Sequence, residues 1–401
     1  KEMGHGLIEL FTSLDSETMA EIFEIYKNDV CYTFTLDEGC EGSSVGTFTS
    51  PYIVKFNERI QVNGEMITDE EVVELAKEVY DIYSLIDTTK HNYPTFFEFV
   101  TYFSKCNLDI AVIEVGIGGL LDSTNVINPI LSVITNVSYD HMNVLGNTLE
   151  EILENKMGII KPNSSAVIGV KDNNLIEVSN SKCKELNTLC YYPLLDNIEI
   201  INSDITGSTF NYENYQNLLI TLPGFHQVEN AIIALKTIQT LRNEFEIKDE
   251  AIYQGLLNTK WLGRLEVLAN NPLIVVDGAH NIDGIKRVAD FIKTLKYKTK
   301  RCIFACSDDK EKDKMITYLE PFFDEIIITA FTYKRHSSAQ ELFEYLDHPN
   351  KILIEDIEKD VNSTLFYEFN EFMEEFNAEI SADLTLKSLG QFIEISGTAQ
   401  G

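Results

Sequence analysis

The run Ala111-Val-Ile-Glu-Val-Gly-Ile-Gly-Gly-Leu-Leu-Asp-Ser-Thr-Asn125 decides the fold of this chain. An apolar segment, Ile110 to Ile113, ends in a single carboxylate, Glu114, and a glycine-rich turn follows. This order is typical of a buried parallel strand that ends at the carboxyl edge of a sheet, where open α/β sheets bind their ligands. Because a buried carboxylate is costly alone, we expect a metal ion or another cation to face it. The alternative is a tight turn with Glu114 simply solvated.

Composition sets the broad class of the protein. The chain has 401 residues, enough for two or three domains, and a hydrophobic content of 44% that is ordinary for globular proteins. No apolar run approaches the roughly 20 residues that a membrane helix needs. No basic start with an apolar segment after it indicates a secretory signal. The seven cysteines are odd in number and scattered, so we expect a reducing, cytoplasmic location.

The formal net charge of −32 argues against a partner that binds to a broad basic face. We therefore expect neither a nucleic acid nor a membrane as partner. An acidic protein can still hold an anionic small molecule in a local basic pocket.

Hydrophobic periodicity and capping signals predict an α/β fold in two parts. In the first part, helices are expected over 18–27, 68–86, 95–104, 148–160 and 229–241, and strands over 110–113, 131–135 and 166–170. Residues 171–220 indicate a small antiparallel sheet. After a break in composition near 269–272, a strand-and-helix pattern restarts. We therefore expect domains over residues 1–267 and 272–401.

Two further clusters of polar residues follow expected strands. Asp140 and His141 come after the strand at 131–135, so with Glu114 on a neighbouring strand they suit Mg²⁺, although a lone histidine is more often a surface or core residue. Lys156 lies on the next helix, where a solvated lysine is the simpler interpretation. In the second part, Asp277-Gly-Ala-His-Asn281 follows the strand at 273–276. Arg264, just before the break, can clamp a phosphate or merely cap a helix.

These clusters resemble the folylpolyglutamate synthase and dihydrofolate synthase family of the Mur ligase superfamily. The similarity covers roughly residues 45–340, and its motifs stand in the family's order. The matching motifs are Phe48-Thr-Ser-Pro51, Asn57-Glu-Arg-Ile60, Thr95-Phe-Phe-Glu98, Glu114-Val-Gly-Ile-Gly-Gly119, Leu121-Asp-Ser-Thr-Asn125, Asp140-His141, Lys156-Met-Gly-Ile-Ile-Lys-Pro162, His226-Gln227, Asn230-Ala231, Trp261, Gly263-Arg264 and Asp277-Gly-Ala-His-Asn281.

The resemblance implies a Mur-ligase-like fold: a P-loop-NTPase-like domain with a mostly parallel sheet and a small antiparallel sheet, then a smaller Rossmann-like domain. It implies a monomeric ATP- and Mg²⁺-dependent ligase of folate biosynthesis and one-carbon metabolism. Such an enzyme joins L-glutamate to a folate or pteroate carboxylate through an acyl phosphate. The active site is expected in the cleft between the domains, with Glu114 and His141 facing Asp277 and Arg264.

The resemblance also assigns roles to single residues. The implied metal ligands are Ser50, Glu114 and His141. The implied catalytic residues are Lys156, His141 and Arg264, and Lys156 is similar to the family lysine that becomes carbamylated. The implied nucleotide contacts are Asn230, Arg264 and Asp277, with His280 beside them. The residues expected to line the pterin-bearing substrate are Leu121, Asp122 and Ser123.

The chain departs from the family where the nucleotide loop is expected. The family's first strand leads into Gly-Thr-Asn-Gly-Lys-Gly-Ser, whose backbone N–H groups and lysine hold phosphates. The corresponding stretch, Phe11-Thr-Ser-Leu-Asp-Ser-Glu-Thr18, has neither glycine nor lysine, and Asp15 and Glu17 would repel a triphosphate. A permuted chain is one alternative, because Gly397-Thr-Ala-Gln-Gly401 followed by Lys1 echoes such a loop.

Two substitutions inside the matching motifs leave further alternatives open. Tyr52 stands where the family usually has histidine, and Leu120 replaces the usual arginine of the glycine-rich turn. The acidic segment at 11–18 favours a pseudoenzyme or binding module that keeps the fold without turning over ATP. The loss of the arginine favours a Mur-type ligase that acts on another carboxylate.

Overall fold

The computed structural model describes most of the chain, in two compact units that we treat separately. The described residues are 6–11, 44–50, 52, 55–84, 106, 108–242, 244–270, 272–308, 310–330, 337–355 and 391–395. The first unit comprises residues 1–202, 209–221 and 227–260, and the second comprises 203–208, 222–226 and 261–401. Within the described ranges, no helix is long and apolar enough to cross a membrane.

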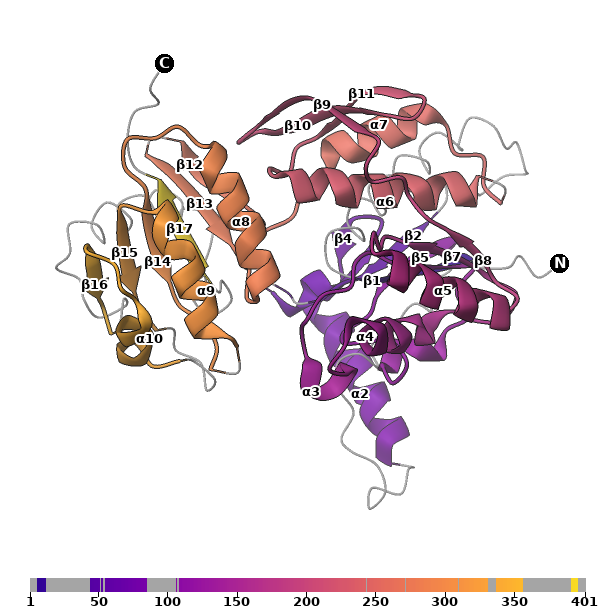
Figure 1. Ribbon diagram of the computed structural model, residues 1–401. Helices are drawn as coiled ribbons and strands as arrows, with labels where there is room; N and C mark the ends of the chain where they lie inside the picture. Colours follow the sequence, from indigo (N-terminus) through magenta and orange to yellow (C-terminus); the bar gives the residue numbers. More distant parts are fainter. Residues whose placement is uncertain are drawn as a thin grey trace. The chain divides into compact units, whose positions relative to one another are not determined.

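The first unit is built on an eight-stranded sheet with the order β4-β3-β2-β5-β1-β6-β7-β8 (Figure 1). Its strands are β1 (Gly6–Phe11), β2 (Val45–Phe48), β3 (Ile60–Val62), β4 (Glu65–Met66), β5 (Ile110–Glu114), β6 (Leu131–Ile134), β7 (Ser165–Ile168) and β8 (Leu189–Tyr191). Strands β2, β5, β1, β6, β7 and β8 pair in parallel. Strands β3 and β4 extend the sheet beyond β2 with antiparallel pairing. All five residues of β5 are buried, as expected for a parallel strand covered on both faces.

Strand β1 separates the two strands that we expected to be neighbours. It pairs with β5 on one side, where Leu10 lies opposite Glu114, and with β6 on the other, where Leu10 lies opposite Val133. At about 4.8 Å for each step across a sheet, β5 and β6 are about 10 Å apart. The expectation of adjacent strands was wrong because strand order depends on pairing with β1, roughly a hundred residues earlier in the chain. The segment at 12–18 lies outside the described residues.

The described part of the first unit contains six helices, two of which begin at capping signals seen in the sequence. They are α2 (Asp69–Ser84), α3 (Met142–Leu145), α4 (Leu149–Lys156), α5 (Asn173–Glu185), α6 (Phe225–Leu241, whose first two residues belong to the second unit) and α7 (Asp249–Asn258). Thr68 and Glu71 cap α2 reciprocally, and Thr148 and Glu151 do the same for α4. The helices predicted at 18–27 and 95–104 lie outside the described residues.

Helix α5 corrects the prediction that residues 171–220 contain only short strands. The Asp172 side chain caps it by accepting from the backbone N–H of Asn174 at 2.8 Å. Leu175, Ser179 and Cys183 are buried at a spacing of four residues, which is the helical signal that the many polar residues obscured. The expected antiparallel sheet is confined to β9 (Ile198–Asp204), β10 (Gly207–Tyr212) and β11 (Tyr215–Ile220).

Apolar packing fixes α4 and α5 against the parallel sheet. Ile134 of β6 and Ile168 of β7 share a buried core with Leu153 of α4 and Leu175 of α5. Cys183 of this core forms a disulfide with Cys190 of β8, a pair that the scattered cysteines did not predict. The end of α4, which carries Lys156, is therefore anchored to the sheet.

The second unit contains a six-stranded sheet with the order β12-β13-β17-β14-β15-β16. Its strands are β12 (Glu266–Asn270), β13 (Leu273–Asp277), β14 (Arg301–Phe304), β15 (Glu325–Ile328), β16 (Lys351–Leu353) and β17 (Gln391–Ile395), and its helices are α8 (Ile282–Thr294), α9 (Lys312–Leu319) and α10 (Ala339–Tyr345). The alternation of strands and helices predicted from residue 273 is confirmed.

Two features of this sheet differ from the expectation. Strand β12 pairs antiparallel with β13, and the longest segment of the second unit starts at Trp261. Strand β17 inserts antiparallel between β13 and β14, from about a hundred residues away in sequence. Both differences arise from pairings between strands that no local pattern encodes.

Candidate active site

Glu114 ends β5 as a buried carboxylate with a defined partner. Its side chain is 3% exposed, and its Oε2 accepts a hydrogen bond of 2.7 Å from the backbone N–H of Ser50. Ser50 follows β2, the strand that pairs with β5 on the side away from β1. The fold therefore brings together two of the three expected metal ligands.

Arg59 provides a positive charge near Glu114. It is 6% exposed, and its Cζ lies 5.0 Å from the ring centroid of Tyr52. Burial lowers the pKa of Arg59 to about 10, against the opposing effects of Tyr52, Glu114 and Glu58. The sequence indicated that Glu114 needs a cation nearby. Arg59 lies in the quoted motif Asn57-Glu-Arg-Ile60, but the sequence analysis gave it no role.

The glycine-rich turn after β5 is closed by Asp122. Its Oδ2 accepts from the backbone N–H of Ile117 at 3.0 Å, and its Oδ1 accepts from the backbone N–H of Thr124 at 3.0 Å. Leu121, in contrast, is 89% exposed. The Asp122 carboxylate therefore shapes the turn, while Leu121 presents an apolar surface. Ser123 begins the 3₁₀ turn that follows.

Asn125 and Lys161 fasten this turn to the segment after α4. The Asn125 side-chain amide donates to the carbonyl oxygens of Leu120 at 3.0 Å and Gly158 at 3.2 Å. Lys161 Nζ donates to the Asn125 backbone oxygen at 2.9 Å. Both residues lie in motifs that the sequence analysis quoted, yet their supporting role was missed because it depends on contacts 36 residues apart.

The turn also touches the end of α4 directly. The backbone N–H of Leu120 donates to the Asn155 carbonyl at 3.0 Å. A Cβ on Gly158 would lie 2.4 Å from Leu120 Cα, and a Cβ on Gly119 would lie 2.7 Å from the Lys156 carbonyl oxygen. Only glycine permits this approach, which places Lys156 directly beneath the turn.

Substitution of Gly158 with alanine tests this close approach. The added methyl group would overlap backbone atoms of Leu120, which cannot rotate away. We expect Gly158→Ala to lower the free energy of unfolding by about 1–3 kcal/mol. Urea denaturation measures the change. Gly64→Ala is the comparison variant. A Cβ at position 64 meets no atom within 4 Å, so this substitution introduces only the backbone strain of a positive φ. Equal stability of Gly158→Ala and the wild type would contradict the packing.

Lys156, Asp140 and His141 form a second polar cluster in the first unit. Burial lowers the pKa of Lys156 to about 8, while the Asp140 carboxylate opposes this shift. Asp140 Oδ1 also accepts from the backbone N–H of His141 at 2.8 Å and lies 3.9 Å from its Nε2. His141 adopts a left-handed backbone conformation with φ 47°, which is uncommon for residues other than glycine.

The chemistry of the donor set fits Mg²⁺. Ser50 follows β2, Glu114 ends β5 and His141 follows β6, and these strands belong to the parallel part of one sheet. They offer a hydroxyl, one carboxylate and one imidazole. The described residues contain no cluster of three histidine, cysteine or acidic side chains that could hold a metal alone. Mg²⁺ binds few protein groups and keeps waters and phosphate oxygens as ligands.

In the second unit, Asp277 ends β13 as another buried carboxylate. It is 4% exposed and accepts from the backbone N–H groups of Leu265 at 2.9 Å and Ala279 at 2.7 Å. Burial raises its pKa, against the effects of Arg264 and the two N–H donors. His280 is exposed, with Nδ1 3.0 Å from the Gly278 carbonyl oxygen. The fold thus places Arg264, Asp277 and His280 around one turn.

Asn230 lies on α6, in the part of that helix that belongs to the first unit. Its side-chain amide donates to Gln227 Oε1 at 3.2 Å, and Gln227 is fully buried. Asn230 thus belongs to the first unit, whereas Arg264, Asp277 and His280 belong to the second.

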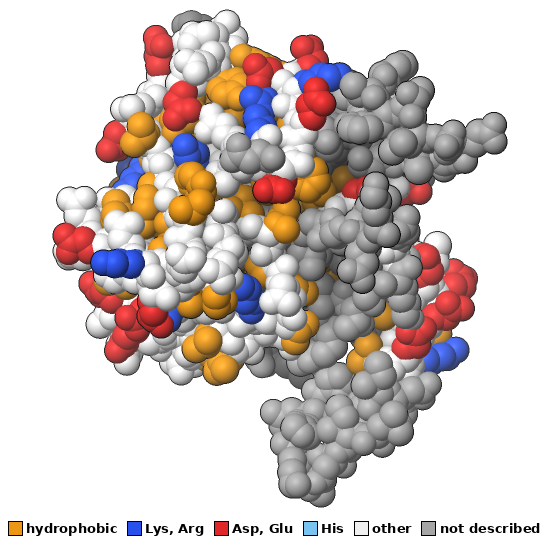
Figure 2. All heavy atoms as spheres, turned by 90° about the vertical axis from the view of Figure 1, so that its right-hand side faces the viewer, with side chains coloured by type: hydrophobic (Ala, Val, Ile, Leu, Met, Phe, Trp, Pro, Cys, Tyr) orange, Lys and Arg blue, Asp and Glu red, His pale blue; other side chains and the backbone are white. Residues whose placement is uncertain are grey.

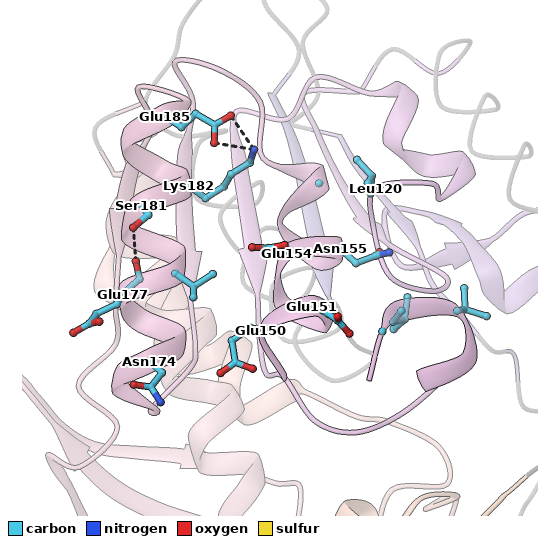
Figure 3. A pocket seen from close by; sticks show the side chains of 15 residues that line it. Leu120, Glu150, Glu151, Glu154, Asn155, Asn174, Glu177, Ser181, Lys182 and Glu185 are labelled. Atoms are coloured by element: carbon cyan, nitrogen blue, oxygen red, sulfur yellow. Dashed lines mark hydrogen bonds and ion pairs between the residues drawn. The ribbon is translucent and has the colours of Figure 1, made fainter. Parts of the chain in front are cut away.

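A groove of 1130 Å³ lies in the first unit between α4 and α5 (Figure 3). Figure 3 shows acidic side chains from both helices around the groove. Lys182 Nζ donates a hydrogen bond to the Glu185 carboxylate. The glutamates that line the groove are Glu150, Glu151, Glu154, Glu177 and Glu185. An anionic folate or nucleotide would be repelled here, so this groove does not suit those substrates.

The face drawn in Figure 2 carries charges of both signs. Figure 2 shows acidic side chains spread among basic and apolar ones on the face in view, without a basic stripe. This pattern agrees with the net charge of −32.

Family models and the fold give the class of protein. The Mur ligase middle domain matches residues 66–238, and the Mur ligase glutamate ligase domain matches residues 263–366. The chain is therefore a Mur ligase by fold. The dihydrofolate synthase/folylpolyglutamate synthase of Bacillus subtilis (strain 168) is 36% identical over 331 residues, which are 79% of this chain and 76% of the relative. The chain belongs to the dihydrofolate synthase/folylpolyglutamate synthase family.

Solved structures agree with this placement. Folylpolyglutamate synthase from Thermotoga maritima matches with a TM-score of 0.75 and 26% identity, over 95% of this chain and 91% of that one. A complex of FPGS with AMPPCP and folate matches with a TM-score of 0.71 and 28% identity, over 88% of each chain. The family and the fold class predicted from the motifs are thus confirmed.

Proposed function

We propose that this protein is an ATP- and Mg²⁺-dependent ligase that joins L-glutamate to the carboxylate of a folate or pteroate. The observation that carries the proposal is the buried Glu114 carboxylate held by the Ser50 N–H at the end of β5. Membership of the family supports it, as does the relative whose structure contains AMPPCP and folate.

The proposed metal ligands are Ser50, Glu114 and His141. When bound, Mg²⁺ would neutralise charge on phosphate oxygens. The protein's own contribution is to hold these groups in place: Glu114 is fixed by the Ser50 N–H, and His141 is oriented beside Asp140. Arg59 adds positive charge near the carboxylate.

Lys156 is proposed as the carbamylated lysine. Carbamylation needs a neutral amine, whose nitrogen bonds to the carbon of CO₂ and then releases a proton. With a pKa of about 8, Lys156 meets this need far better than a solvated lysine. At pH 7 about 10% of such an amine is neutral, against well under 0.1% for an ordinary lysine.

Arg264 and Asp277 are proposed to contact the nucleotide from the second unit, with His280 beside them and Asn230 contributing from α6. The guanidinium of Arg264 would stabilise charge on the phosphoryl group as it is transferred. The substrate carboxylate would take the γ-phosphoryl group of ATP to form an acyl phosphate and ADP. The amino group of glutamate would then attack the acyl carbon, forming the amide and releasing phosphate and a proton. Leu121, Asp122 and Ser123 are proposed to line the pterin-bearing substrate.

The test is to incubate the protein with ATP, Mg²⁺, L-glutamate and either dihydropteroate or a reduced folate. We expect a product longer by one glutamate, seen by mass spectrometry, and an equal release of phosphate. The absence of product and of phosphate release with both acceptors would contradict the proposal.

Two observations support alternatives of the same fold. The segment at 11–18 is acidic and lacks glycine, which favours a protein that binds ligands without ATP turnover. Leu120 is 54% exposed where the family has an arginine, which favours a different acceptor carboxylate. Phosphate release in the assay above separates the first alternative, because turnover of ATP would count against it. A panel of other carboxylate acceptors tests the second.

A further inference from the structure

A group of three nitrogen-bearing side chains gathers in the second unit near the turn that carries Arg264. Its members are His226, Arg264 and Arg287. His226 is the second residue of α6, and Arg287 lies on α8. Both guanidinium groups act electrostatically on the imidazole, and the effect of Arg287 is the larger. His226 lies in the His226-Gln227 motif, to which the sequence analysis gave no role, and Arg287 lies outside all the quoted motifs.

A close backbone approach holds the His226 ring in this position. Gly224 has φ +98°, and a Cβ there would lie 2.7 Å from His226 Cε1 and 3.2 Å from Leu265 Cδ1. Leu265 is fully buried and directly follows Arg264. The imidazole is therefore fixed against the turn that carries Arg264, by a conformation that favours glycine.

The imidazole is neutral at physiological pH. Burial, then Arg287 and Arg264, lower the pKa of His226 to about 3. A neutral imidazole has one N–H donor and one acceptor nitrogen. Within the described part of the chain, no residue makes a hydrogen bond to this ring. The group therefore offers one N–H donor beside two permanent positive charges.

Among the described residues, no carboxylate is ion-paired with Arg287 to offset its charge. Arg264 faces Asp277, which acts on it electrostatically. The acids of α8 one turn to either side of Arg287 are already paired: Asp283 lies 3.5 Å from Lys286 Nζ, and Asp290 lies 2.6 Å from Lys293 Nζ. No described acidic residue forms an ion pair with Arg287. A partly buried guanidinium that shares an imidazole neighbour with a second one, and forms no ion pair with a described acid, favours binding of an oxyanion.

We propose that His226 and Arg287 form, beside Arg264, an oxyanion subsite for one substrate of the ligase. The guanidinium fork of Arg287 and the His226 N–H would donate to the oxygens of one anionic group. Two sources offer this chemistry, a phosphate of the nucleotide and a carboxylate of the amino acid. The choice of these sources rests on the proposed function, whereas the anion-binding chemistry rests on the cluster alone.

The test compares Arg287→Gln with Lys286→Gln. Both remove one positive charge from the same helix, but Lys286 is exposed and pairs with Asp283. Thermal shifts are measured with AMPPCP, L-glutamate and inorganic phosphate separately, and KM and kcat are measured for ATP and glutamate. Circular dichroism checks folding, and Arg287→Lys provides a second variant that keeps the charge without the fork.

We expect Arg287→Gln to raise the KM of one substrate by roughly 10–100-fold while kcat changes less than about 3-fold. The thermal shift from that same ligand should disappear, Lys286→Gln should match the wild type, and Arg287→Lys should fall between. An effect on ATP and AMPPCP identifies a phosphate, and an effect on glutamate identifies a carboxylate. Equal behaviour of the Arg287→Gln and Lys286→Gln variants overturns the subsite.

The subsite can also be tested if the wild-type protein makes no product. A thermal shift with phosphate or AMPPCP that depends on Arg287 then still supports the subsite, whereas the absence of a thermal shift with all three ligands refutes it.

Discussion

Replacing Glu114 with glutamine is expected to lower kcat for glutamate addition by about 10³-fold and to raise the Mg²⁺ concentration needed for half-maximal activity. The amide has nearly the same shape, and its oxygen can still accept the 2.7 Å hydrogen bond from the Ser50 N–H. What it loses is the negative charge that a hard cation requires. Initial rates over a Mg²⁺ series measure both effects.

The same substitution also removes the carboxylate that acts on Arg59. Because both side chains are almost fully buried, we expect the free energy of unfolding to fall by about 1–3 kcal/mol. Glu58→Gln is the matched control, since Glu58 also acts on Arg59 but is not among the proposed metal ligands. It should keep nearly full activity. If Glu114→Gln retains more than a tenth of the rate with an unchanged Mg²⁺ requirement, Glu114 only balances Arg59.

Local sequence patterns predicted the structural features that depend only on neighbouring residues. The apolar run that ends at Glu114 predicted a buried strand, and the Thr148–Glu151 capping box predicted the start of α4; both are confirmed. The polar residues after β13 likewise placed Asp277 at a strand end. These signals can be recognised in the sequence because the periodicity of buried residues and the hydrogen bonds of a helix cap each involve only a few neighbouring residues.

Features that depend on distant pairing could not be predicted. The position of β1 between β5 and β6, and of β17 between β13 and β14, follows from pairing between strands about a hundred residues apart. Arg59 and Arg287 resemble ordinary surface arginines in the sequence, because their significance arises only from the carboxylate or imidazole that the fold brings near them. Helix α5 was missed because polar residues dominate its exposed face.

Replacing Lys156 with methionine is expected to reduce activity by at least about 10²-fold and, at the same time, to stabilise the protein at neutral pH. Methionine has a similar unbranched shape but no charge that must be desolvated. Burial lowers the pKa of Lys156 to about 8. The wild-type fold therefore carries the cost of a partly buried ammonium group whenever that group is protonated.

The pH dependence of this stability has a definite sign. An unfolded lysine titrates near pH 10.5 and Lys156 in the fold near pH 8, so between these values the unfolded state binds more protons. Wild-type stability attributable to Lys156 should thus rise from about pH 8 to pH 10.5. In Lys156→Met this rise is absent, and its advantage is largest below pH 8.

Chemical denaturation at pH 7 and pH 10 measures the difference. Each pKa unit corresponds to about 1.4 kcal/mol, but Lys156 keeps some exposure and faces Asp140, so we expect a gain of about 1–2 kcal/mol at pH 7. Lys182→Met, on the surface of α5, is the control and should show no such pH-dependent gain. A variant that is inactive and less stable at both pH values would mean that Lys156 supports the fold through its contact with Asp140. Stabilisation together with lost activity would mean that the buried amine is retained for the reaction.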